Sequence, residues 1–194
     1  MQPLRLMIYD DTCRGHPLLP GLTHTWIAGS VLYGARDQLD RSLGVVDWSD
    51  ALEWLATVER PRPIEEIQFW GHGKWGRVLI DDVALDTEAL RQGHPLHELL
   101  CAIRSRLVDD ALWWFRTCET FGAEVGHDFA RRWTAFFGSR AASHTYIIGP
   151  WQSGLHVLRP GRRPNWPVDE GLARGTPSSP QKALWSKPGE PRTI

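Results

Sequence analysis

Short apolar runs and longer stretches of helical periodicity succeed one another along the chain. The short runs are typical of buried strands, because a strand covered on both faces of a sheet reads as a nearly continuous apolar stretch. They occupy Leu4–Tyr9, Ile64–Trp70, Leu112–Phe115, His144–Ile148 and Leu155–Leu158. We expect each of these runs to be a strand of one central sheet.

Stretches whose apolar residues recur three and four positions apart lie between these runs and predict helices. The predicted helices cover Thr23–Gln38, a segment that follows Ser49 as N-cap and ends before Pro61, Asp86–Gln92, Leu96–Leu107, and Glu119–Phe137 with Gly138 as its C-cap. Two further apolar pieces, Arg77–Ile80 and Val83–Leu85, flank a two-residue turn. They predict a β-hairpin.

This order of strands and helices predicts an α/β domain over residues 1–158. We expect three layers, α/β/α, with a mostly parallel central sheet and helices on both faces. The composition changes at residue 159, and seven prolines fall between there and residue 194. Residues 159–194 are therefore predicted to be an extended, proline-rich C-terminal tail. Trp166 and Trp185 are the candidates to anchor it to the domain.

Composition and charge exclude several classes of protein. An apolar content of 42% and a net charge of −1 fit a soluble globular protein and offer no basic surface for a nucleic acid or an acidic membrane. The start of the chain, MQPLRLMIYDD, does not resemble a signal peptide, and no apolar run approaches the roughly 20 residues that span a bilayer. Three cysteines, Cys13, Cys101 and Cys118, form no disulfide or zinc pattern. We expect a cytoplasmic protein without a metal or cofactor.

Polar residues gather at the predicted carboxyl ends of the strands. Asp10–Arg14 follow the first strand, His72 follows the second, Cys118 follows the third, and Gly149–Trp151 follow the fourth. In open α/β sheets, ligands bind at this edge. The convergence of these residues is the strongest functional signal in the sequence.

Cys118 and His72 have the chemistry of a nucleophile and its base. Cys118 is predicted to lie where a buried strand gives way to a helix, and the positive end of a helix favours a thiolate. His72 stands between two glycines and is therefore sterically accessible. The backbone N–H groups of Gly73 and Cys118 are candidate oxyanion donors. The alternative is a solvent-facing turn histidine and a buried cysteine at the end of a strand.

The contexts of these two residues resemble a known family. IEEIQFWGHG (Ile64–Gly73) and LWWFRTCETFG (Leu112–Gly122) resemble the two signatures of the caspase–haemoglobinase group of cysteine peptidases, clan CD. His72 precedes Cys118 by 46 residues, close to the roughly 50 of caspases. Cys-Glu-Thr is similar to the Cys-Glu-Ser/Thr of legumain- and CHAT-like members. The Gln-Ala-Cys of caspases is absent, and the closest resemblance is to stand-alone bacterial caspase-like domains.

The resemblance implies a caspase-like fold and a cysteine endopeptidase that acts on a protein or peptide substrate. In that reading His72 is the general base, Cys118 the nucleophile, and Gly73 with Cys118 the oxyanion hole. One alternative is a catalytically inactive caspase-like module that binds a peptide or partner protein. A third reading is a flavodoxin-like domain that binds phosphate at Gly71–Gly76, although no helix follows that glycine-rich loop.

Substrate preference and oligomeric state are less constrained. The resemblance implies that the side-chain pocket lies near Asp10, Asp11 and Arg14 and near Trp151. Two carboxylates outnumber one guanidinium, which favours a lysine or arginine side chain, whereas Arg14 inside the pocket would favour an acidic one. Ordinary solvated loops are the alternative. Trp151 is a candidate wall for an extended substrate strand. The sequence indicates no oligomeric state.

Overall fold

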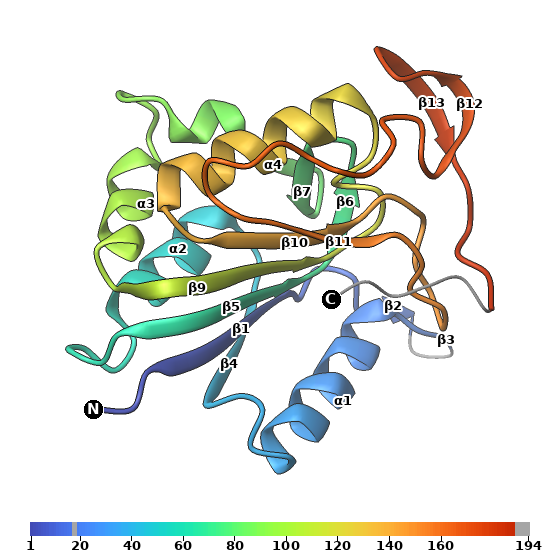
Figure 1. Cartoon of the computed structure of the whole chain (residues 1–194). Coiled ribbons are helices and arrows are strands. Elements are labelled where there is room, and N and C mark those ends of the chain that lie inside the picture. Colours follow the sequence, from blue (N-terminus) through green and yellow to red (C-terminus); the bar gives the residue numbers. More distant parts are fainter. Residues whose placement is uncertain (17–18, 189–194) are drawn as a thin grey trace.

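A mixed six-stranded sheet forms the centre of the computed structural model, which describes residues 1–16 and 19–188 (Figure 1). Its strand order is β11-β10-β9-β5-β1-β4. The strands are β1 Leu4–Asp10, β4 Arg41–Val45, β5 Ile64–Trp70, β9 Leu107–Arg116, β10 Arg140–His144 and β11 Leu155–Leu158. All neighbours are parallel except β10 and β11. The prediction of an α/β domain with a mostly parallel sheet is confirmed.

Helices cover both faces of this sheet, which gives the predicted three layers (Figure 1). The helices are α1 Leu22–Ala35, α2 Trp48–Thr57, α3 His97–Arg104 and α4 Ala123–Phe137. The buried faces of α2, α3 and α4 join one large core on one side, where Trp113 and Phe115 of β9 pack against Trp133 of α4. On the other side, Trp26 of α1 packs with Met7 in a separate, smaller core.

Several short strands and a 3-10 helix lie outside the six-stranded sheet. A three-stranded sheet consists of β6 His72–Lys74, β7 Arg77–Ile80 and β8 Val83–Asp86, followed by a 3-10 helix, Thr87–Leu90. Two-stranded sheets pair β2 Gly15–His16 with β3 Leu19–Pro20, and β12 Leu172–Thr176 with β13 Ser179–Ala183. The predicted hairpin is therefore confirmed as β7–β8. The segment predicted as a helix at Asp86–Gln92 forms only the 3-10 turn.

Several elements differ from the sequence-based expectation: α2 begins at Trp48 with Asp47 as N-cap in place of Ser49, and β9 begins at Leu107, where a helix was predicted to end. Helix α4 begins at Ala123 and not at Glu119, because Glu119 (φ 44°) and Ala123 (φ 63°) both adopt left-handed backbone conformations that interrupt a right-handed helix. The strand predicted at His144–Ile148 lies earlier, at β10. The edge strand β4 was not predicted, because its sequence RSLGV exposes its first two residues and includes a glycine.

The segment predicted as an extended tail contains regular structure, since β12 and β13 form a hairpin within it. Trp166 is buried and stacks on Phe121, with ring centroids 5.5 Å apart. Its indole Nε1–H donates to the Phe121 carbonyl at 3.2 Å. Further along, Ile147 N donates to the Leu184 carbonyl and Ser186 N to the Ile147 carbonyl, both at 2.9 Å. Residues 189–194 of the predicted tail lie outside the described residues.

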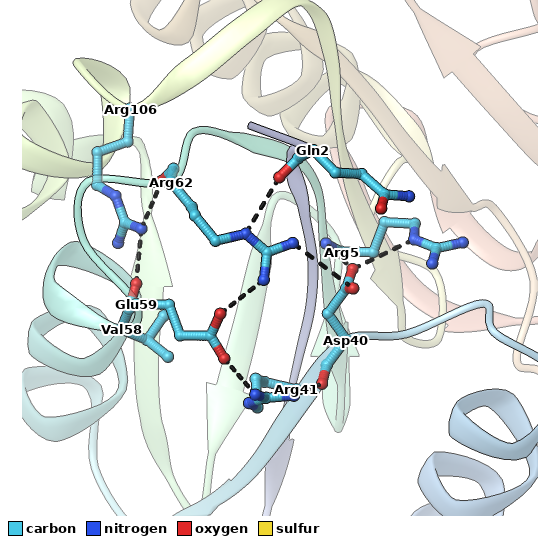
Figure 2. Close-up of polar contacts among 8 residues, drawn as sticks. All are labelled: Gln2, Arg5, Asp40, Arg41, Val58, Glu59, Arg62 and Arg106. Carbon is cyan, nitrogen blue, oxygen red and sulfur yellow. Dashed lines mark hydrogen bonds and ion pairs between the residues drawn. The ribbon is translucent and has the colours of Figure 1, made fainter.

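Polar groups close the edge of the sheet at which the parallel strands begin (Figure 2). The Arg106 guanidinium donates to three backbone carbonyls, those of Leu55, Val58 and Arg62. Arg62 in turn pairs with Glu59 and donates to the Gln2 carbonyl. Asp40 bridges Arg5 and Arg62, and Glu59 bridges Arg62 and Arg41. The opposite, carboxyl edge carries the candidate site.

Candidate active site

Three neighbouring strands carry candidate residues at their carboxyl ends. In the sheet, β5 lies between β1 and β9, and all three are parallel. Asp10 is the last residue of β1, His72 comes two residues after β5, and Cys118 comes two residues after β9. The fold therefore brings the ends of the three predicted segments to one edge of the sheet.

The hairpin that carries His72 packs directly onto the turn that carries Cys118. A Cβ atom added at Gly73 would lie 2.6 Å from Thr117 Cβ and 2.8 Å from the Cys118 carbonyl oxygen, so only glycine permits this approach. Gly76 N also donates to the Thr120 carbonyl at 2.9 Å. The two candidate oxyanion donors, the N–H groups of Gly73 and Cys118, belong to the two segments that meet here.

The turn after β9 is held on its other side by the loop that follows β10. Glu119 N donates to the Tyr146 carbonyl at 2.9 Å, and Phe121 N to the His144 carbonyl at 3.0 Å. Inside the turn, the hydroxyls of Thr117 and Thr120 lie 2.7 Å apart and are both fully buried. These bonds fix a compact turn between β9 and α4.

Cys118 lies in an environment that keeps its thiol protonated. Burial raises the pKa of Cys118, an interaction with the Ile148 backbone lowers it in part, and the neighbouring Glu119 carboxylate raises it further. The thiol also donates a long hydrogen bond to the Ile148 carbonyl, with Sγ 3.9 Å from the oxygen. Helix α4 begins only at Ala123, five residues after Cys118, so Cys118 is not among the first residues of that helix. The expected shift toward thiolate is contradicted, because burial raises the pKa of Cys118.

The imidazole of His72 contacts a different cysteine. Its Nε2 lies 3.3 Å from Sγ of Cys13, which follows β1. The ring also meets Trp26 of α1 edge-on, with centroids 5.9 Å apart. In the described parts of the chain, no hydrogen bond joins His72 to Cys118. Burial raises the pKa of Cys13 as well, so the contact joins a neutral thiol to the imidazole.

Asp10 and Asp11 are each engaged within the protein. Asp10 is fully buried and accepts hydrogen bonds from the backbone N–H and hydroxyl of Thr12, at 2.9 and 2.6 Å, and from Asp81 N at 3.2 Å. It thereby holds the loop after β1 against the β7–β8 turn. Asp11 forms an ion pair with the exposed Arg14. Neither carboxylate stands free to receive a cationic side chain.

Arg116, two residues before Cys118, is held among aromatic rings. Its guanidinium carbon lies 4.1 Å from the ring centroid of Trp70, 4.6 Å from that of Trp114 and 5.3 Å from that of Tyr33. It donates to the Tyr33 hydroxyl at 2.6 Å and to Gln152 Oε1 at 3.3 Å. No carboxylate pairs with it among the residues that the structure describes. A half-buried, uncompensated cation therefore borders the site.

Two further side chains complete the surroundings of Cys118. Trp151 is 48% exposed, on the loop whose Ile148 carbonyl contacts the thiol. Glu119 is only 6% exposed, and its Oε2 has no hydrogen-bond partner within residues 1–16 and 19–188. Burial raises the pKa of Glu119, while the positive charge of Lys74 lowers it.

Sequence reasoning placed Cys13 at this edge within Asp10–Arg14 but not in contact with His72, and it did not identify Arg116 or Tyr33 as parts of the site. A signal existed for Arg116: it pairs in register with Trp70 on the adjacent strand, and residues paired across a sheet share a face. Cys13 and Tyr33 had no such signal, because their positions depend on a loop and on the docking of α1.

Comparison with known proteins adds no assignment. No protein-family model matches the chain, and no curated protein matches its sequence. Within residues 1–16 and 19–188, no group of three or more histidine, cysteine, aspartate or glutamate side chains is placed to hold a metal ion. In the same residues, no helix combines the length and apolar character that crossing a bilayer requires. A functional proposal therefore depends on the geometry of the carboxyl edge.

Proposed function

We propose that this protein is a cysteine endopeptidase of the caspase-like type, with Cys118 as nucleophile and His72 as general base. One observation carries the proposal. The backbone of Gly73 packs so closely on the Thr117–Cys118 turn that a single methyl group would not fit between them. A histidine and a cysteine at the ends of adjacent parallel strands are thereby held on two segments in direct contact.

The proposed reaction starts from a neutral thiol, because burial raises the pKa of Cys118. His72 exchanges its contact with Cys13 for one with Cys118 when substrate binds, and such contacts commonly tighten only in the substrate complex. Its imidazole then accepts the thiol proton as sulfur attacks the peptide carbonyl. The leaving amine takes that proton, and water hydrolyses the resulting acyl-enzyme. The N–H groups of Gly73 and Cys118 stabilise the developing oxyanion.

The position of Arg116 favours substrates that carry an acidic side chain next to the scissile bond. Among the described residues no carboxylate pairs with its guanidinium, whereas Asp10 and Asp11 are both occupied. The aromatic rings around Arg116 restrict its motion, and a guanidinium binds a carboxylate through two parallel hydrogen bonds. Gln152 and Tyr33 offer additional polar groups at the same place.

A second candidate function is a peptide-binding module of the same fold without turnover. Two observations favour it: the raised pKa of Cys118 and the contact of His72 with Cys13 instead of Cys118. In this case the carboxyl edge of the sheet still recognises an acidic peptide through Arg116. The two functions differ in whether His72 activates the thiol.

The test is the rate of alkylation of Cys118 by iodoacetamide as a function of pH, followed by mass spectrometry of each cysteine. We expect the rate to rise toward alkaline pH, because the thiol pKa is raised. If His72 activates Cys118, His72→Ala slows the reaction near neutral pH, and Cys13→Ala accelerates it by releasing the imidazole.

A matched control exists on α3, where His97 Nε2 lies 3.4 Å from Sγ of Cys101. The substitution His97→Ala leaves Cys118 alkylation unchanged. A fluorogenic peptide library then tests turnover, with acidic peptides cleaved by the wild type and not by Cys118→Ala. A Cys118 rate indifferent to His72, together with binding of acidic peptides that Arg116→Gln abolishes, would establish the binding module instead.

A further inference from the structure

A pocket rich in arginine lies at the edge of the sheet opposite the candidate active site. Its volume is about 370 Å³, within the usual range for small-molecule sites. It lies where β10 begins and where the antiparallel β11 ends, so it opens at the amino edge of the parallel strands. Four of its seven lining residues are arginines: Arg140, Arg159, Arg162 and Arg163.

The positive charge of this pocket is largely uncompensated. Asp110 pairs with Arg140 at 3.2 Å and with Arg159 at 2.5 Å. Arg162 and Arg163 are exposed and form no ion pair in the described part of the chain. Four cations thus share one carboxylate in direct contact, which leaves an excess of three positive charges around one small volume. Such a concentration of positive charge attracts anions.

The backbone presents these side chains from a constrained turn. Pro160 and Pro164 fix two φ angles between β11 and the anchored Trp166, and Gly161 supplies the left-handed conformation (φ 72°) that the turn requires. Arg162 N donates to the Arg159 carbonyl at 3.2 Å. The turn therefore fixes the backbone from which three guanidinium groups reach the pocket, so binding has to order only their side chains.

We propose that this pocket binds a small molecule with a di- or triphosphate group. Arginine binds phosphate oxygens through its planar, two-pronged donor group, and a chain of two or three phosphates carries the negative charge that balances the excess. Val157 and Leu158 of β11 supply the apolar part of the lining and Asn165 a polar amide. The site is independent of the proposed peptidase function, because it lies at the other edge of the sheet.

Isothermal titration calorimetry with inorganic pyrophosphate, inorganic triphosphate and ATP tests the proposal. We expect saturable binding at one site, weakened by added salt. Arg162→Ala/Arg163→Ala weakens binding about tenfold or more for each arginine removed. Equal affinities for triphosphate and ATP would identify the phosphate chain as the ligand, and a clear preference for ATP would identify a nucleotide.

The control is Arg131→Ala/Arg132→Ala on α4, which removes the same charge from two arginines that both pair with Asp128. It leaves the affinity unchanged. Arg162→Lys/Arg163→Lys retains the charge but loses the two-pronged geometry, so an intermediate affinity is expected. The proposal is overturned if the wild type binds none of the three compounds saturably. It is also overturned if the control weakens binding as much as Arg162→Ala/Arg163→Ala, because the effect would then be one of net charge.

Discussion

The close approach of Gly73 to the Cys118 turn gives the sharpest prediction, for the substitution Gly73→Ala. The added methyl carbon would lie 2.6 Å from Thr117 Cβ and 2.8 Å from the Cys118 carbonyl oxygen, where ordinary contacts begin at 3.4 Å. Both neighbours are fixed to the backbone and cannot rotate away, so the two segments must separate by close to an ångström. Overpacking of this kind costs about 1–3 kcal/mol.

The net change in stability is smaller, because alanine lowers the entropy of the unfolded chain. That effect offsets about 0.4–1 kcal/mol, which leaves a destabilisation of up to about 2.6 kcal/mol. For a domain of this length, each kcal/mol lowers Tm by about 2–4 °C, so we expect a decrease of up to about 10 °C in a thermal melt followed by circular dichroism. If the peptidase proposal holds, an ångström of displacement also lowers peptide cleavage by about 100-fold.

Gly34→Ala is the matched control, since no atom lies within 4 Å of the position of its added Cβ atom. Gly34 is in the last turn of α1, where alanine is a better helix former, so Tm rises or stays constant. The packing argument is refuted if Gly73→Ala and Gly34→Ala have the same Tm and Cys118 alkylation is unchanged in both.

Three further substitutions test other parts of the fold. Arg106→Met removes the donor to three backbone carbonyls, of which Figure 2 shows those of Val58 and Arg62. It lowers stability by about 2–4 kcal/mol in urea unfolding, whereas an unchanged midpoint would contradict its structural role. Burial raises the pKa of Glu66 above its unfolded value, so the wild type loses stability as pH rises through the folded pKa. Glu66→Gln is therefore more stable than the wild type at pH 8 but not at pH 4. An equal difference in unfolding free energy between the two proteins at both pH values would refute this. Trp166→Ala removes the ring stacked on Phe121 and His156 and costs about 3–5 kcal/mol. Limited proteolysis then cuts the segment after β11, and resistance equal to the wild type would show that Trp166 does not anchor it.

The predictability of each strand follows its apolar content. The runs at Leu4–Tyr9 and Ile64–Trp70 predicted β1 and β5 within one residue, because both are central strands whose side chains are mostly buried. β10 was misplaced since its buried residues Ala141, Ala142 and Ser143 are small and give little hydrophobic signal. Burial in these cases is decided by neighbouring layers, which a local pattern does not contain.

The sequence predicted the edge of the sheet at which the candidate site lies, but not the contacts between its side chains. The rule that parallel strands end together placed His72 and Cys118 on the same side of the sheet. The ring contact with Cys13 was not predictable, because it depends on how buried Asp10 shapes the loop after β1. The protonation of the Cys118 thiol was mispredicted for a related reason. Glu119 adopts a left-handed backbone conformation, so α4 begins further along the chain than the sequence predicted.

The bonds that residues 184–187 make to the loop after β10 have a consequence for the order of folding. Ile147 is held by Leu184 and Ser186, and the Ser153 hydroxyl by the backbone of Lys187. This loop also supplies the carbonyl that contacts Cys118.

A chain that leaves the ribosome from its N-terminus can form β1, β5 and β9 early, because domains begin to fold during synthesis. The loop beside Cys118 can form its bonds to residues 184–187 only after residue 187 has left the ribosome. Nascent chains shorter than that carry the six-stranded sheet without the bonds that hold the loop beside Cys118. Thiol reactivity in ribosome-stalled chains of increasing length would therefore change when residue 187 has emerged.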